Sequence, residues 1–386
     1  MYGKDAVMEF VKKQLRRLQL MDLPYSTNKI SLDNEGYITT INSEKMIALN
    51  FYNLGIFEAG LRQEHDSKLV KFLIAYLVKA KSLHFFELVF EDLYEEFLLY
   101  LNEGKFVYRT IALIHRLDTK NQVVSFPDFC IRPVDKENIE YFYNNLEEYY
   151  NHFSLRHMQN NHLPNAITML EQKQVLEDSA KRKPIREQIE KLGQSVVLYN
   201  GVTEHIYFSP VITFSYFDNN AMIKEYDYIY NVKNERLRGF VRMDDPAILV
   251  SYFQNITLLK NKFIALDRLA SAHNKTDMED KFIDLMIALE SMFPSITSEV
   301  TFRIALYTAT LLDRSQDTYK TVKGLYKTRS NLVHGSSKLS REQLAKQLDE
   351  LDGIVRKVIV QALEYHAKGF GLGKMEEDIV KVLLPN

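Results

Sequence analysis

Residues 325–335 have the sequence Leu-Tyr-Lys-Thr-Arg-Ser-Asn-Leu-Val-His-Gly, and this stretch decides the fold of the C-terminal part of the chain. If the segment is helical from about Thr318, its apolar side chains share one arc and Arg329 falls near the middle of that arc. Because a guanidinium keeps its charge in proteins, burying it requires an anionic partner or a water-filled cleft. Gly335 is placed to end the helix, which leaves His334 at an exposed terminus. An arginine and a titratable imidazole at this spacing can serve one phosphate-bearing site.

The same stretch resembles a known family of proteins. The run from Arg329 to His334 fits the Arg-x4-His signature of HEPN domains, and the longer run of residues 325–335 is similar to the Apea-like branch. Residues 282–293 (Phe-Ile-Asp-Leu-Met-Ile-Ala-Leu-Glu-Ser-Met-Phe) resemble the helix of that branch that ends in an aliphatic-Glu pair, and residues 302–306 resemble its next helix. The resemblance implies an all-α, HEPN-like antiparallel helical bundle.

The resemblance covers about residues 245–367 and implies RNA cleavage without a metal ion or other cofactor. An imidazole can take the proton of a ribose 2′-hydroxyl or return one to the leaving 5′-oxygen, while a guanidinium stabilises charge on the phosphorane. RNA brings its own nucleophile, so Arg329 and His334 are the expected catalytic residues, and the expected products carry a 2′,3′-cyclic phosphate and a 5′-hydroxyl. The resemblance also implies a homodimer and a role as a toxin or effector in prokaryotic defence or stress response.

Four further residues near the motif are candidates for supporting roles. Glu290 and Arg303 are expected to be structural neighbours of the motif rather than chemical groups. Asn331 is placed to position a phosphate or to hold the imidazole through its side-chain amide, and Ser330 is a weaker candidate of the same kind.

An alternative assigns the motif no chemistry. Arg329 would then form a buried salt bridge to Glu290, and His334 would cap the helix and interact with its dipole. Many HEPN proteins keep the fold without cleaving RNA. The alternative function is therefore a non-catalytic RNA-binding or scaffolding subunit of a defence complex.

Basic residues predominate around the motif. Lys320, Lys323 and Lys327 fall on one helical face, which would attract a polyanion such as RNA. Phosphate contacts of this kind provide affinity and register but little sequence reading. A lysine-rich exposed face is also common on soluble helices, so this pattern alone does not decide the partner. The net charge of −2 excludes a generally basic nucleic-acid coat, and any RNA site must therefore be a local patch.

Composition sets the outer bounds of the fold and the compartment. With 386 residues, 46% apolar and 26% charged, the chain is long enough for two domains of ordinary globular type. Cys130 is the single cysteine, which excludes an intramolecular disulfide and suits a reducing compartment. His115, His152, His157 and His162 show no metal-ligand spacing, so no metal site is expected. Without a leader pattern or a long apolar run, the sequence predicts a cytoplasmic protein with no membrane partner.

Residues 1–235 are expected to form an α+β region that acts as a sensor or binds a partner protein or ligand. The pattern predicts helices over residues 4–20, 43–59, 69–76, 85–103 and 136–153. The many acidic residues of 85–103 are expected to form a solvated face. Aromatic and β-branched runs predict a hairpin of residues 106–117 and 122–132, and further strands within 195–230, including Val196–Tyr199. The basic cluster of residues 181–186 is expected to be an exposed linker.

Residues 236–386 are expected to form the HEPN-like helical domain. Asp245 and Pro246 mark the start of a helix that the apolar pattern continues to about Ala272. Further helices are expected over 278–292 and 297–312. In the second of these, Phe302, Leu306 and Ala309 are expected to form the buried apolar stripe. The motif helix follows, and Ser340-Arg-Glu-Gln343 predicts a capping box for the last long helix. The glycines at 369, 371 and 373 are expected to end that helix and begin a flexible tail.

Overall fold

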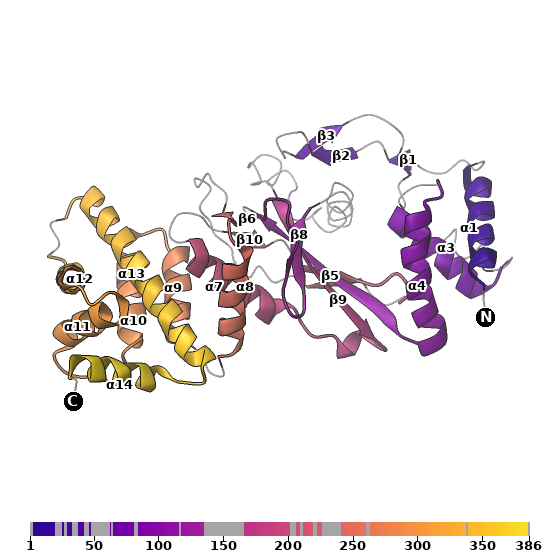
Figure 1. Ribbon diagram of the computed structural model, residues 1–386. Helices are drawn as coiled ribbons and strands as arrows, with labels where there is room; N and C mark the ends of the chain where they lie inside the picture. Colours follow the sequence, from indigo (N-terminus) through magenta and orange to yellow (C-terminus); the bar gives the residue numbers. More distant parts are fainter. Residues whose placement is uncertain are drawn as a thin grey trace. The chain divides into compact units, whose positions relative to one another are not determined.

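The computed structural model describes residues 3–19, 62, 65–80, 84–115, 117–134, 166–200, 206–208, 211–218, 241–259, 263–336 and 339–384, with short strands at 25–26, 29–32, 38–41, 46–47 and 222–225. These residues are mostly helical, with a small antiparallel sheet (Figure 1). Contacts divide the chain into two compact units. Unit 1 comprises residues 1–115, 126–185 and 208–228, and unit 2 comprises residues 116–125, 186–207 and 229–386. In place of a single boundary at 235/236, the chain alternates between the units.

A twisted antiparallel sheet forms the centre of unit 1. Its strands follow the order β12-β11-β5-β9-β8 and comprise β12 (Met222–Glu225), β11 (Val211–Phe214), β5 (Phe106–His115), β9 (Ala166–Leu176) and β8 (Cys130–Pro133). The pairing of β5 with β9 extends from Phe106 opposite Leu176 to His115 opposite Ala166, with an irregularity after Ile114. Every residue of β5 from 107 to 114 is buried, as expected for a strand covered on both faces.

The strand at residues 106–115 confirms the pattern, but the expected hairpin is wrong. β5 pairs with β9 and β11, and the segment after the turn carries only the short strands β7 (Val124–Ser125) and β8. β8 pairs with the other edge of β9, from Cys130 opposite Glu171 to Pro133 opposite Thr168. Pro127 lies between β7 and β8, where it interrupts the strand that the hairpin would need. β9 has eleven residues and can therefore pair along the whole of β5.

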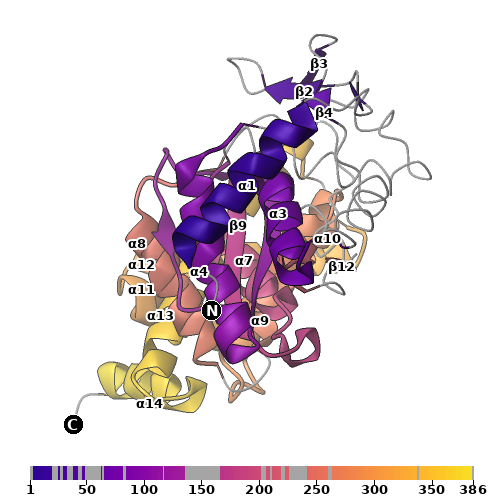
Figure 2. The same ribbon diagram turned by 90° about the vertical axis from the view of Figure 1, so that its right-hand side faces the viewer.

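Helices α1 (Lys4–Gln19), α3 (Ser67–Ala80) and α4 (Glu87–Glu103) complete unit 1 and confirm three predicted helices. α1 contacts α3, and α3 contacts α4 (Figure 2). Their shared core is aromatic: Phe72 packs edge-on against Phe90 and Phe97 and stacks on Phe217. Apolar residues four or so positions apart on each helix are buried there, which is the helical period expected of them.

Two other predicted helices have different outcomes. Of residues 43–59, only Met46–Ile47 are described, and they form the strand β4, which pairs with β1 (Tyr25–Ser26); the helix is wrong at these two positions. The predicted helix at 136–153 lies outside the described residues. The remaining short elements are β2 (Lys29–Leu32), which pairs with β3 (Ile38–Ile41), the 3-10 turn η1 (Ser179–Lys181), β10 (Tyr207–Phe208), and the parallel pair of β6 (Leu117–Asp118) and β13 (Val241–Arg242).

Unit 2 is built mainly from helices, and those from residue 246 onward are joined by short connections. They are α7 (Arg186–Asn200), α8 (Pro246–Thr257), α9 (Ile264–Asn274), α10 (Met278–Ser291), α11 (Val300–Leu312), α12 (Gln316–Val333), α13 (Arg341–Ala367) and α14 (Leu372–Leu383). The long helix α13 contacts all of α8 to α12 and α14 (Figure 1). The buried faces of these helices form one continuous apolar core. The capping box at Ser340 and Gln343 is present, as predicted.

The expected long helix at the start of this region is broken. Asp245 caps α8 and Pro246 occupies its first turn, as predicted, but α8 ends at Thr257 and α9 begins at Ile264. The break lets α8 pack on α7 while α9 packs on α10. The apolar period continues through the connection in the sequence, so periodicity alone joins two helices that bury different surfaces.

Residues 195–200 form a helix, so the predicted strand at Val196–Tyr199 is wrong. They belong to α7, whose buried residues Ile189, Leu192 and Val196 repeat at helical spacing. Local β propensity of the two adjacent valines is overridden by packing against α8 and α9. The end of the chain differs too: residues 372–383 form α14, with Met375 and Ile379 buried against the bundle instead of a flexible tail.

Candidate functional site

Helix α12 carries the Arg-x4-His segment, and its buried face is narrower than the sequence suggests. Ser315 caps its first turn by accepting a hydrogen bond from the Thr318 N–H at 3.0 Å. The side chains that α12 buries are Val322, Leu325, Tyr326, Thr328 and Leu332. Arg329 is 36% exposed, so it lies at the edge of this face and reaches solvent.

The end of α12 holds His334 at the helix terminus. His334 is the C-cap residue, and Gly335 follows with a positive φ of 63°. The Gly335 N–H donates to the Leu332 carbonyl at 3.1 Å, and the Ser336 N–H donates to the Asn331 carbonyl at 2.9 Å. These two bonds define a Schellman motif, which fixes the backbone on both sides of His334. The predicted roles of Gly335 and of the exposed His334 terminus are confirmed.

Arg329 is paired with Glu290 of α10, but loosely. Its Nη2 atom lies 3.9 Å from Glu290 Oε1, beyond hydrogen-bonding distance. Its Nε atom is buried and has no hydrogen-bond partner among the described residues. Tyr326, one turn earlier on α12, faces the same carboxylate: burial raises the pKa of its phenol, and the charge of Glu290 raises it further. The structure therefore brings together two of the predicted residues and adds a third that the sequence did not single out.

The other supporting candidates are placed less closely. Ser330 is exposed, and its carbonyl accepts the His334 N–H at 3.1 Å. Asn331 contributes its carbonyl to the Schellman motif. Arg303 contacts Tyr307 instead of the motif, donating from Nη2 to the phenolic oxygen at 3.3 Å.

The face of α11 on which Arg303 was placed is also different from the predicted one. Phe302 is 48% exposed, and the helix buries Ile304, Ala305, Tyr307, Thr308 and Ala309. The exposed Phe302 ring packs edge-on against Tyr319 of α12, with ring centroids 6.1 Å apart.

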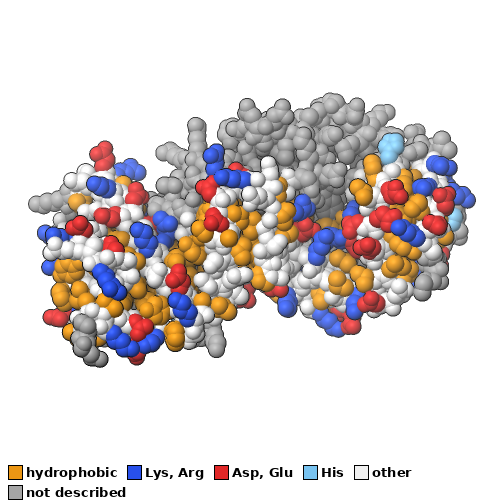
Figure 3. Space-filling model, in the orientation of Figure 1, with side chains coloured by type: hydrophobic (Ala, Val, Ile, Leu, Met, Phe, Trp, Pro, Cys, Tyr) orange, Lys and Arg blue, Asp and Glu red, His pale blue; other side chains and the backbone are white. Residues whose placement is uncertain are grey.

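Lys320, Lys323 and Lys327 are all exposed on α12. Within the described part of the chain, none of the three forms an ion pair, and Lys323 Nζ lies 5.8 Å from the centre of the Tyr319 ring. On the face of the molecule in Figure 3, basic side chains are interspersed with acidic ones and form no broad single-sign surface. Unpaired lysines on one helical face are thus available to a polyanion as a local patch.

A buried charge network lies in the same bundle and was not predicted. Asp352 of α13 is 1% exposed and accepts hydrogen bonds from His273 Nε2 and Arg356 Nε, both at 2.8 Å. Burial alone would raise the pKa of the Asp352 carboxyl, yet these two partners hold it below its usual range. Because His273 and Asp352 are 79 positions apart, no local pattern signals their contact.

A second buried carboxylate, Asp284 of α10, is paired with three groups of the segment around α9. Arg268 Nη1, Ser271 Oγ and Lys275 Nζ lie 3.1, 2.7 and 2.7 Å from its oxygens. Beside this cluster a cavity of about 490 Å³ opens between α7 and α9, lined by Glu190, Gln194, Asp267, Ala270, Ser271, Asn274 and Lys275. Its hydroxyl, amide and charged groups suit a small polar molecule.

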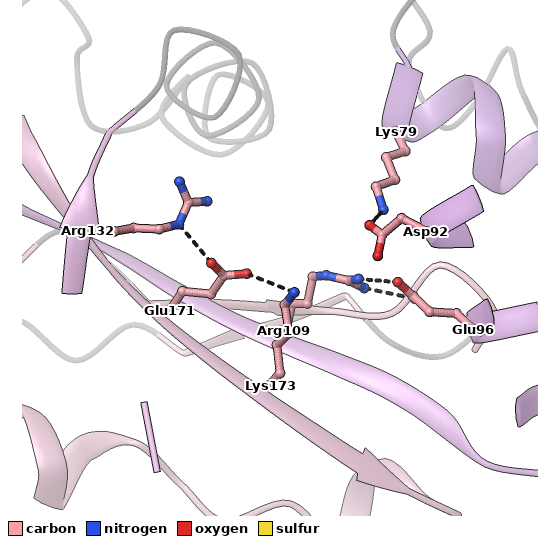
Figure 4. A network of polar contacts seen from close by, with 7 residues as sticks. All are labelled: Lys79, Asp92, Glu96, Arg109, Arg132, Glu171 and Lys173. Atoms are coloured by element: carbon pink, nitrogen blue, oxygen red, sulfur yellow. Dashed lines mark hydrogen bonds and ion pairs between the residues drawn. The ribbon is translucent and has the colours of Figure 1, made fainter. Parts of the chain in front are cut away.

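The acidic helix α4 of unit 1 is not simply a solvated face. Glu96 is 6% exposed and pairs with Arg109 of β5, whose Nη1 donates to Glu96 Oε2 at 2.8 Å (Figure 4). Asp92 pairs with Lys79 of α3, and burial lowers the pKa of that lysine. Charge complementarity therefore joins α4 to both the sheet and α3. The expected solvated face is wrong at the buried Glu96, whereas Asp92 is exposed as expected.

Further along the same face of the sheet, Glu171 of β9 is shared by two cations (Figure 4). Arg132 Nε donates to Glu171 Oε2 at 2.8 Å, and Lys173 Nζ lies 3.9 Å from Oε1. The basic cluster of residues 181–186 is likewise tied down: Arg182 donates to Thr213 Oγ1 at 2.5 Å and Arg186 to Glu190 at 3.2 Å. These contacts stabilise structure and supply no recognisable reaction chemistry.

Metal-ligand clusters and membrane-spanning helices are both absent from the described residues. No group of three or more His, Cys, Asp or Glu side chains in this part of the chain is arranged to hold a metal ion. The side chain of His115 and residues 152, 157 and 162 lie outside the description. Among the helices described, none is both long and apolar enough to cross a bilayer.

Comparison with known proteins adds no relative. No protein-family model matches the chain, and no curated protein or solved structure is detectably similar to it. Membership of the HEPN family is therefore a proposal that depends on the residues of the motif and on their surroundings.

Proposed function

We propose that this chain is a metal-independent endoribonuclease of HEPN type, with its C-terminal helices as the HEPN-like bundle and Arg329 and His334 as its catalytic residues. One observation carries the proposal: a guanidinium with an incomplete set of partners and an exposed imidazole share the last turns of one helix. Five residues span about 7.5 Å along a helix axis, a distance that a long arginine side chain can cover. The proposal requires both groups to meet one scissile phosphate.

The reaction would use the ribose 2′-hydroxyl of the substrate as nucleophile. One imidazole accepts the 2′-hydroxyl proton while the oxygen attacks the adjacent phosphorus, and the Arg329 guanidinium stabilises the charge of the phosphorane. A proton then passes to the leaving 5′-oxygen. Because the motif contains only His334, a homodimer with facing motifs would supply the second imidazole. Lys320, Lys323 and Lys327 would hold the flanking phosphates.

The biological setting is part of the same proposal. By its resemblance to the Apea-like branch, the chain would act in the cytoplasm as a toxin or effector of prokaryotic defence or stress response. The N-terminal α+β region, with its paired helices and sheet, would sense a signal or bind a partner. Its described residues carry ion pairs that stabilise structure, which supports a binding role over a second catalytic one.

A second candidate is a non-catalytic RNA-binding or scaffolding subunit of a defence complex. The ion pair between Arg329 and Glu290 favours it, because an arginine that already has a carboxylate partner need not meet a phosphate. The looseness of that pair and the partly exposed Arg329 side chain favour the enzyme.

One assay separates the two candidates. The full chain is incubated with end-labelled single-stranded RNA of mixed sequence in excess chelator, beside His334→Ala, Arg329→Ala and the exposed control Lys357→Ala on α13. The enzyme predicts cleavage by the parent and the control, loss of cleavage in both motif variants with unchanged circular dichroism, and products with 2′,3′-cyclic phosphate ends. RNA bound but uncut by the parent identifies the scaffold, and a parent that neither binds nor cuts RNA refutes both.

A further inference from the structure

Three polar groups meet between α10 and α12 with their hydrogen bonding incomplete. They are the Glu290 carboxylate, the Arg329 guanidinium and the Tyr326 phenol. Arg329 Nη2 lies 3.9 Å from Glu290 Oε1, and Arg329 Nε and Tyr326 Oη are both buried without a hydrogen-bond partner of regular geometry among the described residues. Buried polar atoms in folded proteins are nearly always paired, so each exception requires an explanation.

Two other arginine–carboxylate pairs of unit 2 are closer than this one. In the same bundle, Arg356 donates to Asp352 at 2.8 Å and Arg268 donates to Asp284 at 3.1 Å. Arginine favours close, charge-assisted contacts with carboxylates. The long separation at Glu290 is therefore a property of the α10–α12 site and is not shared by the buried carboxylates around it.

Charge makes Glu290 the acceptor for two competing donors. Arg329 carries a permanent positive charge. Tyr326 is only 6% exposed, and burial together with the negative charge of Glu290 raises the pKa of the phenol, so its hydroxyl stays protonated and can donate. A single carboxylate thus faces a guanidinium on one side and a phenol on the other. Hydrogen bonding to Glu290 adds to the rise in the pKa of the Tyr326 phenol, but neither contact has the regular geometry of a full hydrogen bond.

We propose that Glu290 is a displaceable partner of Arg329 and that Tyr326 holds the carboxylate once it is displaced. An RNA phosphate would take the guanidinium, whose planar fork matches phosphate oxygens. Glu290 would then accept the Tyr326 hydroxyl hydrogen bond in place of Arg329. No covalent bond and no proton changes position in this exchange. Tyr326 is thereby a positioning residue, and the exchange rests on the proposed function in that Arg329 meets RNA phosphate.

The exchange predicts effects of opposite sign for two conservative variants. Glu290→Gln removes the charge that competes with phosphate, so RNA should bind about fivefold more tightly, the size of a partly exposed ion pair. The same variant should turn over more slowly, because the free guanidinium is less well oriented. Tyr326→Phe leaves Glu290 with Arg329 as its remaining donor, so RNA should bind about threefold more weakly.

The test measures binding apart from cleavage. Fluorescence anisotropy with 2′-O-methyl RNA, which lacks the nucleophile, gives Kd for the parent, both variants and each variant combined with Arg329→Ala. The exposed Glu350→Gln on α13 is the charge-matched control, and thermal melts verify folding. Tighter binding by Glu290→Gln, weaker binding by Tyr326→Phe, and the disappearance of both effects without Arg329 would support the exchange.

Other outcomes separate the exchange from the proposed function. The exchange is overturned and the nuclease stands if the parent binds and cleaves RNA but both variants shift Kd in the same direction. The same conclusion follows if each variant shifts Kd as much in the Arg329→Ala background as in the parent. If the parent neither binds nor cleaves RNA, the proposed function fails. Titration of the same variants with inorganic pyrophosphate then decides the exchange, which requires Glu290→Gln to tighten pyrophosphate binding only when Arg329 is present.

Discussion

Replacing Lys320, Lys323 and Lys327 together by glutamine tests whether α12 is the surface that meets RNA. The substitution removes three positive charges while keeping side-chain length and helix propensity. All three lysines are exposed, and within the part of the chain that the structure describes none has an ion-pair partner. The fold should therefore be stable in the variant, with a change in unfolding free energy within about 0.5 kcal/mol.

The expected effect is on the salt dependence of binding. Each phosphate of single-stranded nucleic acid that a cation neutralises contributes about 0.7 to the slope of log K against log salt. Three lost contacts should lower the magnitude of the slope by about 2.1. Over a fourfold increase in salt, the parent should therefore lose roughly 18-fold more affinity than the variant.

The assay is a salt titration of 2′-O-methyl RNA binding by anisotropy. Its control is the triple glutamine variant of three exposed lysines, namely Lys346 and Lys357 of α13 and Lys368 at its C-cap, which are spaced by about three helical turns and so lie near one face. The control changes net charge equally but leaves α12 intact, so its slope should match that of the parent. Equal slope changes in both triple variants would mean that only overall charge matters, and α12 would lose its assigned role.

Two further predictions concern the bundle around the motif. Asp352→Ala should lower the free energy of unfolding in urea by about 3–5 kcal/mol because it leaves the buried His273 and the partly buried Arg356 without their carboxylate partner, whereas the exposed Asp349→Ala should cost under about 0.5 kcal/mol. The pKa of the Asp352 carboxyl is depressed in the folded state, so its contribution to the free energy of unfolding is present above the ordinary carboxyl pKa of about 4. That contribution is lost as the pH falls through the folded-state pKa. A difference in unfolding free energy between the parent and Asp352→Ala that persists in strong acid contradicts this assignment. Gly335→Ala should lower the free energy of unfolding by about 1 kcal/mol because Gly335 has a positive φ, and it should slow RNA cleavage by shifting His334. Gly335→Asn should restore both stability and cleavage, because asparagine tolerates this backbone conformation. No neighbour crowds this position, so equal behaviour of the two variants would rule out the backbone explanation.

The sequence predicts the ends of several helices because their signals are local. Asp245 with Pro246 starts α8, Ser340 with Gln343 starts α13, and Gly335 ends α12. Each of these signals acts on backbone groups within a few residues, so it can be recognised without knowledge of the tertiary structure.

The parts that the sequence misses depend on contacts between distant segments. β5 pairs with β9, some fifty or more residues further on, although a turn directly after β5 favours a hairpin. Residues 195–200 are drawn into a helix because α7 packs on α8 and α9, with Leu198 in their shared core. At the candidate site the same limit applies: Arg329 and His334 follow from one short motif, whereas the position of Tyr326 opposite Glu290 follows from how α10 packs on α12.

The interleaving of the two units sets an order on how the chain can fold during synthesis. α7 leaves the ribosome before α8 and α9, the helices on which it packs. At typical elongation rates the next 74 residues, up to Asn274, take on the order of 4–15 s. Throughout that interval Leu198, buried in the core of the finished bundle, has no apolar surface of α8 or α9 to cover it. The nascent polypeptide therefore presents a hydrophobic helix to chaperones before the bundle exists to receive it.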